Sequence, residues 1–198
     1  ILPAIKALAK KVRVPISVDT YKPEVARQAL DCGAVCVNDI CGLRSPGMRK
    51  AVSRHKAGVV IMHMQGEPRT MQKNPHYVSL MDEVINFLSK AVAQATGAGI
   101  AREGIVIDPG LGFGKTLEHN LQLLNSLGEL KVLGRPILAG CSRKSFIGKI
   151  LGLEAKERVF GTVAACVLAA RQGAKILRVH DVKEVRQALK VFDTITHN

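Results

Sequence analysis

The stretch Ile105-Val-Ile-Asp108-Pro-Gly-Leu-Gly-Phe-Gly-Lys115 decides the fold of this sequence. A short β-branched run ends on an acidic residue and passes directly into a glycine-rich loop. Parallel strands that are covered on both faces have this continuous apolar character. The same pattern recurs along the chain and predicts five further strands, at residues 14–19, 35–40, 59–64, 136–140 and 175–180.

Helical patterns lie between these runs. Pro23 and Pro46 stand near the first turns of two of them, and Gly33 and Gly58 follow their last turns, as is typical of helix ends. Residues 1–11 have the character of the end of an amphipathic helix. The other predicted helices are residues 23–30, 46–56, 79–95, 117–127, 158–171 and 183–195.

Six βα units in a row fit either an open doubly wound sheet or a closed barrel. An open sheet gathers its ligand groups at one switch point, whereas a barrel collects them from many strand ends at its C-terminal mouth. Here polar residues end nearly every run: Asp19, Asn38, His63, Asp108, Lys144 and His180. We therefore predict an α/β fold of the (β/α)₈ TIM-barrel type.

The length of the chain is short for such a barrel. A complete barrel has eight βα units and typically about 250 residues, whereas this sequence has 198 residues. We expect the first two βα units to lie upstream of Ile1. Residues 1–198 would then form the C-terminal three-quarters of one barrel domain, with strands 3–8 and their helices.

The composition excludes several classes of protein. No apolar run approaches the ~18 residues of a membrane span, and the first residues do not form a charged leader. The five cysteines include no Cys-x-x-Cys pair, so a zinc site is not expected. We predict reduced thiols in a cytoplasmic protein that does not enter a membrane.

The net charge of +13 raises the question of nucleic-acid binding. The 29 Lys and Arg residues are scattered over many predicted helices, and only two Tyr and no Trp are present for base stacking. This distribution is typical of solvated helix faces, and part of the charge would favour an anionic small substrate. No nucleic-acid partner is predicted.

Three strand ends carry side chains that can bind a flat heterocycle. Asp19, Asn38 and Asp108 combine acceptors with an amide that both donates and accepts, and so could match the polar edge of such a ring. Asp39 should point away from Asn38, because successive side chains alternate along a strand. A single Asp in such a place is often a helix N-cap, but three at successive strand ends favour a ligand.

The glycine loop does not match a nucleotide-binding P-loop. Pro109 stands where the first glycine of that pattern is required, so an ATPase is not expected. The backbone N–H groups of the loop could still approach a ligand. Phe113 has two open interpretations, as a core residue or as an aromatic face against a bound ring. Residues 65–77 fit either an active-site loop or a plain surface connection.

Two further pairs lie after the last two strands. Lys144 and Ser145 would suit an anionic or carbonyl-bearing ligand, although a surface lysine with a capping serine is the alternative. Arg178 and His180 share a face by strand alternation and would form an anion clamp for phosphate. The alternative is that Arg178 pairs with Asp181 and that the histidine is half-buried.

Taken in order, these motifs resemble the dihydropteroate synthase family closely. The related methyltetrahydrofolate methyltransferases share the barrel but lack the combination of the last two motifs, and they come second. The matching blocks run from about Pro15 to the end of the chain and are Ser17-Val-Asp-Thr20, Val37-Asn-Asp-Ile40, Met62-His-Met-Gln-Gly66, Asp108-Pro-Gly-Leu-Gly-Phe-Gly-Lys115, Ser142-Arg-Lys-Ser145 and Arg178-Val-His-Asp-Val182.

The resemblance implies a reaction and a partner set. The family condenses 6-hydroxymethyl-7,8-dihydropterin pyrophosphate with p-aminobenzoate in folate biosynthesis, gives dihydropteroate and pyrophosphate, and is the target of sulfonamides. It implies Mg²⁺ on the leaving group, with the metal ligand upstream of Ile1, and a homodimer. Part of the p-aminobenzoate site would also lie upstream, so the fragment alone is expected to be inactive. A truncated pterin-binding or scaffold protein without activity is the remaining alternative.

The resemblance also implies the roles of individual residues. Lys144 and Asp108 would be the catalytic residues. Ser145 would lie near the benzoate carboxylate, and Arg178 and His180 would bind the pyrophosphate. The residues implied to surround the pterin are Asp19, Asn38, Ile40, Met62, Asp108, Gly112, Phe113 and Lys144.

Overall fold

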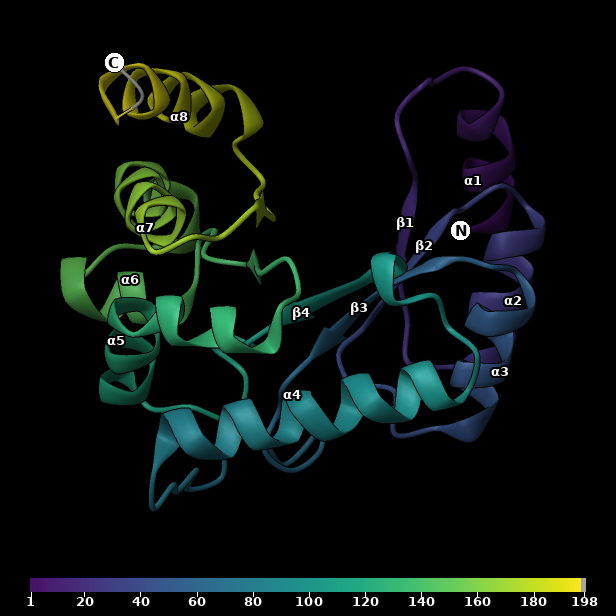
Figure 1. The fold of residues 1–198 in the computed structure, drawn as a ribbon. Helices are drawn as coiled ribbons and strands as arrows, with labels where there is room; N and C mark the ends of the chain where they lie inside the picture. Colours follow the sequence, from purple (N-terminus) through teal and green to yellow (C-terminus); the bar gives the residue numbers. More distant parts are fainter. Residues whose placement is uncertain (197–198) are drawn as a thin grey trace.

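The computed structural model describes residues 1–196 and shows an α/β fold (Figure 1). Its parallel strands are β1 (Ser17–Asp19), β2 (Cys36–Asp39), β3 (Gly58–Met62), β4 (Ile105–Asp108), β5 (Leu138–Ala139) and β6 (Ile176–Leu177). Its α-helices are α1 (Leu2–Ala9), α2 (Pro23–Asp31), α3 (Pro46–Arg54), α4 (Leu80–Gly97), α5 (Leu117–Asn125), α6 (Ser145–Leu151), α7 (Val159–Arg171) and α8 (Val182–Thr196).

The strands follow one another in space in the order of the sequence. β1 to β4 form one parallel sheet, and β5 pairs with β6. A parallel bridge between Ile107 and Ile137 connects the two groups. β1 and β6 each have a single strand partner among the described residues, so the wall they form is not closed. Sequential parallel strands with helical crossovers are what the alternating pattern predicted.

The core lies between the strands and the helices that cover them. Val37, Val59, Ile61, Ile105 and Ile107 are fully buried at the centre of the sheet. Each side chain of this kind contributes about 1.5–3 kcal/mol when it leaves water. Figure 1 shows α1, α2 and α3 gathered at the β1 end of the strand series, and α5 to α8 gathered at the β6 end. The first strand and the last strand of the series are thus covered by two separate groups of helices.

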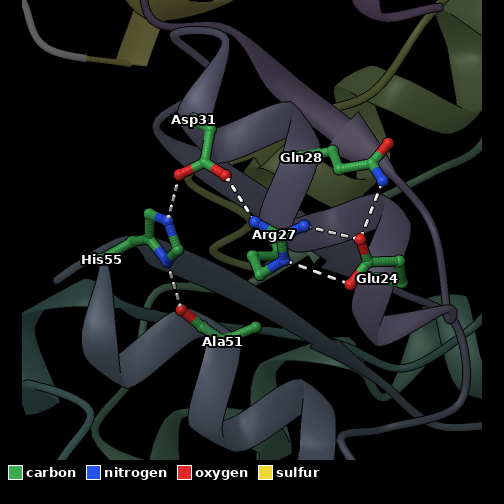
Figure 2. A network of polar contacts seen from close by, with 6 residues as sticks. All are labelled: Glu24, Arg27, Gln28, Asp31, Ala51 and His55. Carbon is green, nitrogen blue, oxygen red and sulfur yellow. Dashed lines mark hydrogen bonds and ion pairs between the residues drawn. The ribbon is translucent and has the colours of Figure 1, made fainter.

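The helices α2 and α3 pack against each other and share a polar network on their surface (Figure 2). His55 follows α3 and connects the Ala51 carbonyl oxygen, at 2.8 Å, with the Asp31 carboxylate of α2, at 2.9 Å. Arg27 connects that carboxylate with Glu24. The network links the two helices on the side away from the core.

Several elements differ from the sequence-based prediction. The strands predicted at residues 136–140 and 175–180 are present as β5 and β6, but each is only two residues long. α6 was not predicted, since its seven residues include Gly148, which hides a helical pattern. Short 3₁₀ helices occupy Arg102–Gly104, Leu127–Leu133 and Ala155–Glu157. The predicted helix at the start of the chain is present as α1.

Two negative findings concern the described residues alone. No helix within residues 1–196 is long and apolar enough to cross a membrane. Within the same range, no group of three or more His, Cys, Asp or Glu side chains is arranged to hold a metal ion.

Candidate functional site

A cavity lies at the carboxyl ends of the strands, where a parallel α/β fold binds its ligands. Its volume is about 70 Å³, and every strand sends a residue from its end or from the loop that follows it. The lining residues are Asp19, Asn38, Ile40, Met62, Asp108, Leu111, Phe113, Gly140, Lys144 and Arg178. The structure therefore brings together all of the predicted site residues except Gly112, Ser145 and His180.

Asp108 is the last residue of β4 and is 6% exposed. Its Oδ1 accepts a hydrogen bond from the Gly110 backbone N–H at 2.7 Å. Burial raises the pKa of the Asp108 carboxyl to about 6, and that N–H together with the nearby cations of Lys144, Lys115 and Arg178 opposes the rise. A buried carboxylate with a pKa this close to neutrality is typical of a functional site.

Asn38 supplies the second polar group of the cavity. Its side-chain oxygen is buried and has no hydrogen-bond partner in the described structure. An unsatisfied buried acceptor costs about 1–3 kcal/mol, so a ligand that donates a hydrogen bond would remove this cost. The neighbouring Asp39 points elsewhere and accepts hydrogen bonds from the backbone N–H groups of Cys41 and Leu43, at 2.8 and 3.1 Å. The alternation predicted for this pair is present.

Lys144 and Phe113 form a cation–π pair at the mouth. The Lys144 Nζ lies 4.3 Å from the centroid of the Phe113 ring, a favourable geometry for this interaction. Burial lowers the pKa of Lys144, and the Asp108 carboxylate opposes that change. Gly112 lies under the lysine stem, because a Cβ there would be 3.1 Å from Lys144 Cδ. Gly112 thus makes room for the lysine without lining the cavity itself.

Arg178 pairs with Asp19 across the open side of the strand wall. Both side chains are about half-exposed, at 56% and 48%, so water screens the pair and its energy is small. Two of the predicted ligand-binding groups therefore neutralise each other in this structure. A charged ligand would have to compete with this pairing.

His180 and Ser145 lie outside the cavity. His180 contacts the Ser142 hydroxyl through its backbone N–H at 3.1 Å and its Nδ1 at 2.9 Å. β6 ends at Leu177, so strand alternation does not extend to His180, and only Arg178 of the pair lines this cavity. The role of His180 at the pyrophosphate stays a prediction. Ser145 is the exposed first residue of α6. The alternative pairing of Arg178 with Asp181 is wrong, because Asp181 binds Arg143 at 2.5 and 3.0 Å.

The sequence did not lead to an assignment for Lys115, which contacts the loop that lines the cavity. This lysine is 4% exposed and contacts His63 behind the glycine loop. The available signal was a single lysine within a run of glycines after a buried strand. The loop of residues 65–77 reaches the same place, since Gln72 donates a hydrogen bond to the Gly112 carbonyl oxygen at 2.6 Å.

Comparison with known proteins gives the class and then the family. A sequence profile described as pterin binding enzyme matches residues 1–180, so the chain is a member of the pterin-binding enzyme class. The dihydropteroate synthase of Escherichia coli strain K12 is 45% identical over 193 residues, which cover 98% of this chain and 68% of the relative. The chain belongs to the dihydropteroate synthase family, a group of transferases in folate biosynthesis.

Solved structures agree with this assignment. The Yersinia pestis dihydropteroate synthase in complex with a sulfonamide drug superimposes with a TM-score of 0.97 at 42% identity and covers 100% of this chain and 72% of its own. The Thermus thermophilus enzyme in complex with 6HMPPP gives a TM-score of 0.95 at 44% identity. The match covers 99% of this chain and 78% of the Thermus chain. The Thermus enzyme has also been solved with 4-aminobenzoate.

Proposed function

We propose that the cavity at the strand ends is the pterin site of a dihydropteroate synthase. The observation that carries this proposal is the unpartnered, buried oxygen of Asn38 beside the buried carboxylate of Asp108. Two acceptors held in an apolar frame match the N–H donors along one edge of a pterin ring. Met62, Ile40 and Phe113 add apolar surface to the same cavity, against which the ring can pack.

The reaction joins the amine nitrogen of p-aminobenzoate to the methylene carbon of 6-hydroxymethyl-7,8-dihydropterin pyrophosphate. The bond from that carbon to the pyrophosphate oxygen breaks, pyrophosphate leaves with the electron pair, and the amine loses a proton. Asp108, by accepting from the pterin, would favour the electron-rich ring that stabilises a cationic methylene. Lys144 and Arg178 place positive charge at the same mouth, where the leaving group gathers negative charge.

Mg²⁺ is predicted for the family, and it would neutralise the departing pyrophosphate. Residues 1–196 contain no group of three or more potential ligand side chains, so we assign no residue of this chain to the ion. An ion held mainly by the pyrophosphate and by upstream residues is consistent with magnesium's preference for phosphate oxygens and water.

The barrel would be completed by two further βα units between β6 and β1. Both strands have one unpaired edge within the described range, and an exposed edge is a template for a further strand. A groove of about 1110 Å³ runs beside β6 between α7 and α8, with apolar residues such as Leu177, Val179 and Leu189 along it. A packed crossover helix would cover such a groove. The second-substrate site is proposed to come with these units.

A homodimer and a cytoplasmic location remain predictions. The homodimer has support from exposed apolar side chains on α6 and α7. Phe160 is 83% exposed, Ile150 55% and Leu151 46%. The two helices are in contact, and exposed large apolar side chains are what a protein interface would cover. A sedimentation measurement that finds only monomers at high protein concentration would contradict this part of the proposal.

A calorimetric titration of the chain with the pterin pyrophosphate tests the site directly. We expect binding by the wild-type chain and a marked loss in Asn38→Leu, which removes the unpartnered oxygen together with its amide donor. Val37→Ile, a change at the neighbouring buried position outside the cavity, serves as the matched control. A folded chain that does not bind the pterin would contradict the proposal.

A further inference from the structure

Lys115 is a buried lysine whose Nζ lies within hydrogen-bond distance of three polar atoms. Its Nζ lies 3.0 Å from the Gly110 carbonyl oxygen, 3.0 Å from the Phe113 carbonyl oxygen and 3.1 Å from His63 Nδ1. Lysine is almost never fully buried unless it is paired. An ammonium with three acceptors meets that condition. The position of this cation is therefore defined by the loop and by the histidine.

The His63 ring, which contacts the Lys115 Nζ, is buried and packed against neighbouring side chains. When Lys115 is protonated, its ammonium donates to Nδ1 of the neutral ring, and the ring proton then lies on Nε2. Burial lowers the pKa of His63 to about 3, and the charges of Lys115 and Arg44 lower it further. The ring also packs edge-on against Phe87, with centroids 5.0 Å apart and an interplanar angle of 89°. The histidine thus acts as an anchored acceptor.

The other two acceptors belong to the loop that forms one wall of the cavity. Leu111 and Phe113 line the cavity, and the carbonyls of Gly110 and Phe113 enclose this segment. Gly110 has a φ of +71°, and a Cβ there would collide with the backbone carbonyl oxygen of His63. The loop therefore lies directly against His63, and Lys115 ties it there.

Lys115 also acts on Asp108 through its charge. The cations that face the buried carboxylate are Lys144, Lys115 and Arg178, and each of them lowers the pKa that burial raises. The effect is reciprocal. Burial lowers the pKa of Lys115 to about 7, and the charge of Asp108 opposes this change. Lys115 is the most deeply buried of the three cations. Unlike Lys144 and Arg178, it does not line the cavity.

We propose that Lys115 is a positioning residue of the pterin site, which holds the Gly110–Phe113 loop against His63, and with it the Gly110 N–H that binds Asp108, without touching the ligand. The inference rests on the proposed pterin site. It predicts two separable effects of removing the cation. The loop loses its anchor, which weakens binding at every pH, and Asp108 becomes easier to protonate, which moves the pH dependence of binding.

The test is a calorimetric titration with 6-hydroxymethyl pterin between pH 5 and pH 7.5. This ligand lacks phosphate groups, which would themselves titrate near pH 6. Wild-type binding should weaken as the pH falls through about 6, where Asp108 takes up a proton, and again as it rises through about 7, where Lys115 loses one. In Lys115→Met, affinity should fall about ten-fold or more, as expected for the loss of charge-assisted hydrogen bonds, and the midpoint of the pH dependence should move upward.

Gln72→Leu is the matched control. It removes one hydrogen bond to the same loop, at the Gly112 carbonyl oxygen, and changes no charge. We expect a smaller loss of affinity and an unchanged midpoint. A merely structural role for Lys115 would give the same pattern as this control and would overturn the inference.

The remaining outcomes are also decisive. If Lys115→Met does not unfold cooperatively in urea, His63→Leu takes its place, since it removes one acceptor and leaves the charge. Reduced affinity in that variant supports the anchor, and unchanged affinity overturns it. If the wild-type chain binds the pterin and Lys115→Met has the same affinity and pH dependence, the inference alone is refuted. If the wild-type chain does not bind the pterin, the proposed site and the inference are refuted together.

Discussion

The polar cluster around Lys115 and the surface network of α2 and α3 have similar hydrogen-bond lengths and opposite surroundings. In the cluster, contacts of 2.7 to 3.1 Å join groups that are 4–6% exposed. In the surface network of Figure 2, contacts of 2.6 to 3.1 Å join Arg27 and Glu24, whose side chains are 50% and 64% exposed. Distance alone does not separate the two regions.

The difference lies in what happens when one partner is removed. Water replaces a lost partner in the surface network, and salt screens its charges. In the buried cluster no water replaces the partner, so the remaining group is left without one. The buried cluster also carries the shifted pKa values of Asp108, His63 and Lys115. Burial, rather than hydrogen-bond length, therefore separates the two regions.

The largest expected effect comes from Asp108→Asn and has two opposite parts. Pterin affinity should weaken by about 1–3 kcal/mol, because a charged acceptor becomes a neutral amide. Stability should rise at neutral pH. The folded pKa of about 6 exceeds the ordinary value of 3.8, so the wild-type chain loses stability as the pH rises between these values, by up to about 3 kcal/mol.

Calorimetry and urea unfolding at pH 5 and pH 8 measure both parts. Asp39→Asn is the control, because this carboxylate is also buried but binds backbone N–H groups away from the cavity. It should leave pterin affinity nearly unchanged. Unchanged affinity in Asp108→Asn would remove this residue from the site.

An intermediate effect is expected at Arg178, a half-exposed cation at the edge of the buried cavity. Arg178→Lys should weaken the pterin pyrophosphate about ten-fold and the bare hydroxymethyl pterin much less, because only the former uses a bidentate contact. Comparative titration with the two ligands measures the ratio. Equal losses would place Arg178 in a structural role with Asp19 instead of at the anion.

The smallest effect is expected in the surface network. His55 gains a hydrogen bond to Asp31 and another to the Ala51 carbonyl, which raise its pKa. Its contribution to stability is therefore present below its ordinary pKa of 6.5 and is lost as the pH rises through the folded value. His55→Gln should shift the urea midpoint slightly at pH 5.5 and not at pH 8.5, and salt should reduce the shift. A large shift of the urea midpoint at both pH values would contradict the view that the surface network contributes little to stability.

The sequence predicted the strands and most of the cavity for one physical reason. Strands such as β3 and β4 are buried on both faces, and this leaves a continuous apolar run that ends at the mouth. Residues at those ends, such as Asn38 and Asp108, could therefore be placed without a structure.

The failures have equally specific causes. The role of Lys115 depends on His63, which lies 52 positions away, and no local pattern reports such a contact. His180 does not line the cavity beside Arg178, because the short edge strand ends before it, and the end of such a strand cannot be read from alternation. The pairing of Asp181 with Arg143 is likewise a contact between distant loops.

The central claim is that this chain holds the pterin half of a dihydropteroate synthase and needs two further βα units for the other half. A product assay with Mg²⁺, pterin pyrophosphate and p-aminobenzoate tests it on the 198-residue chain and on a chain extended by the upstream third of a relative. We expect pterin binding without product from the short chain and dihydropteroate from the extended one, since water exclusion and proximity depend on a complete mouth. Full turnover by the short chain, or no turnover by a well-folded extended chain, would contradict the account.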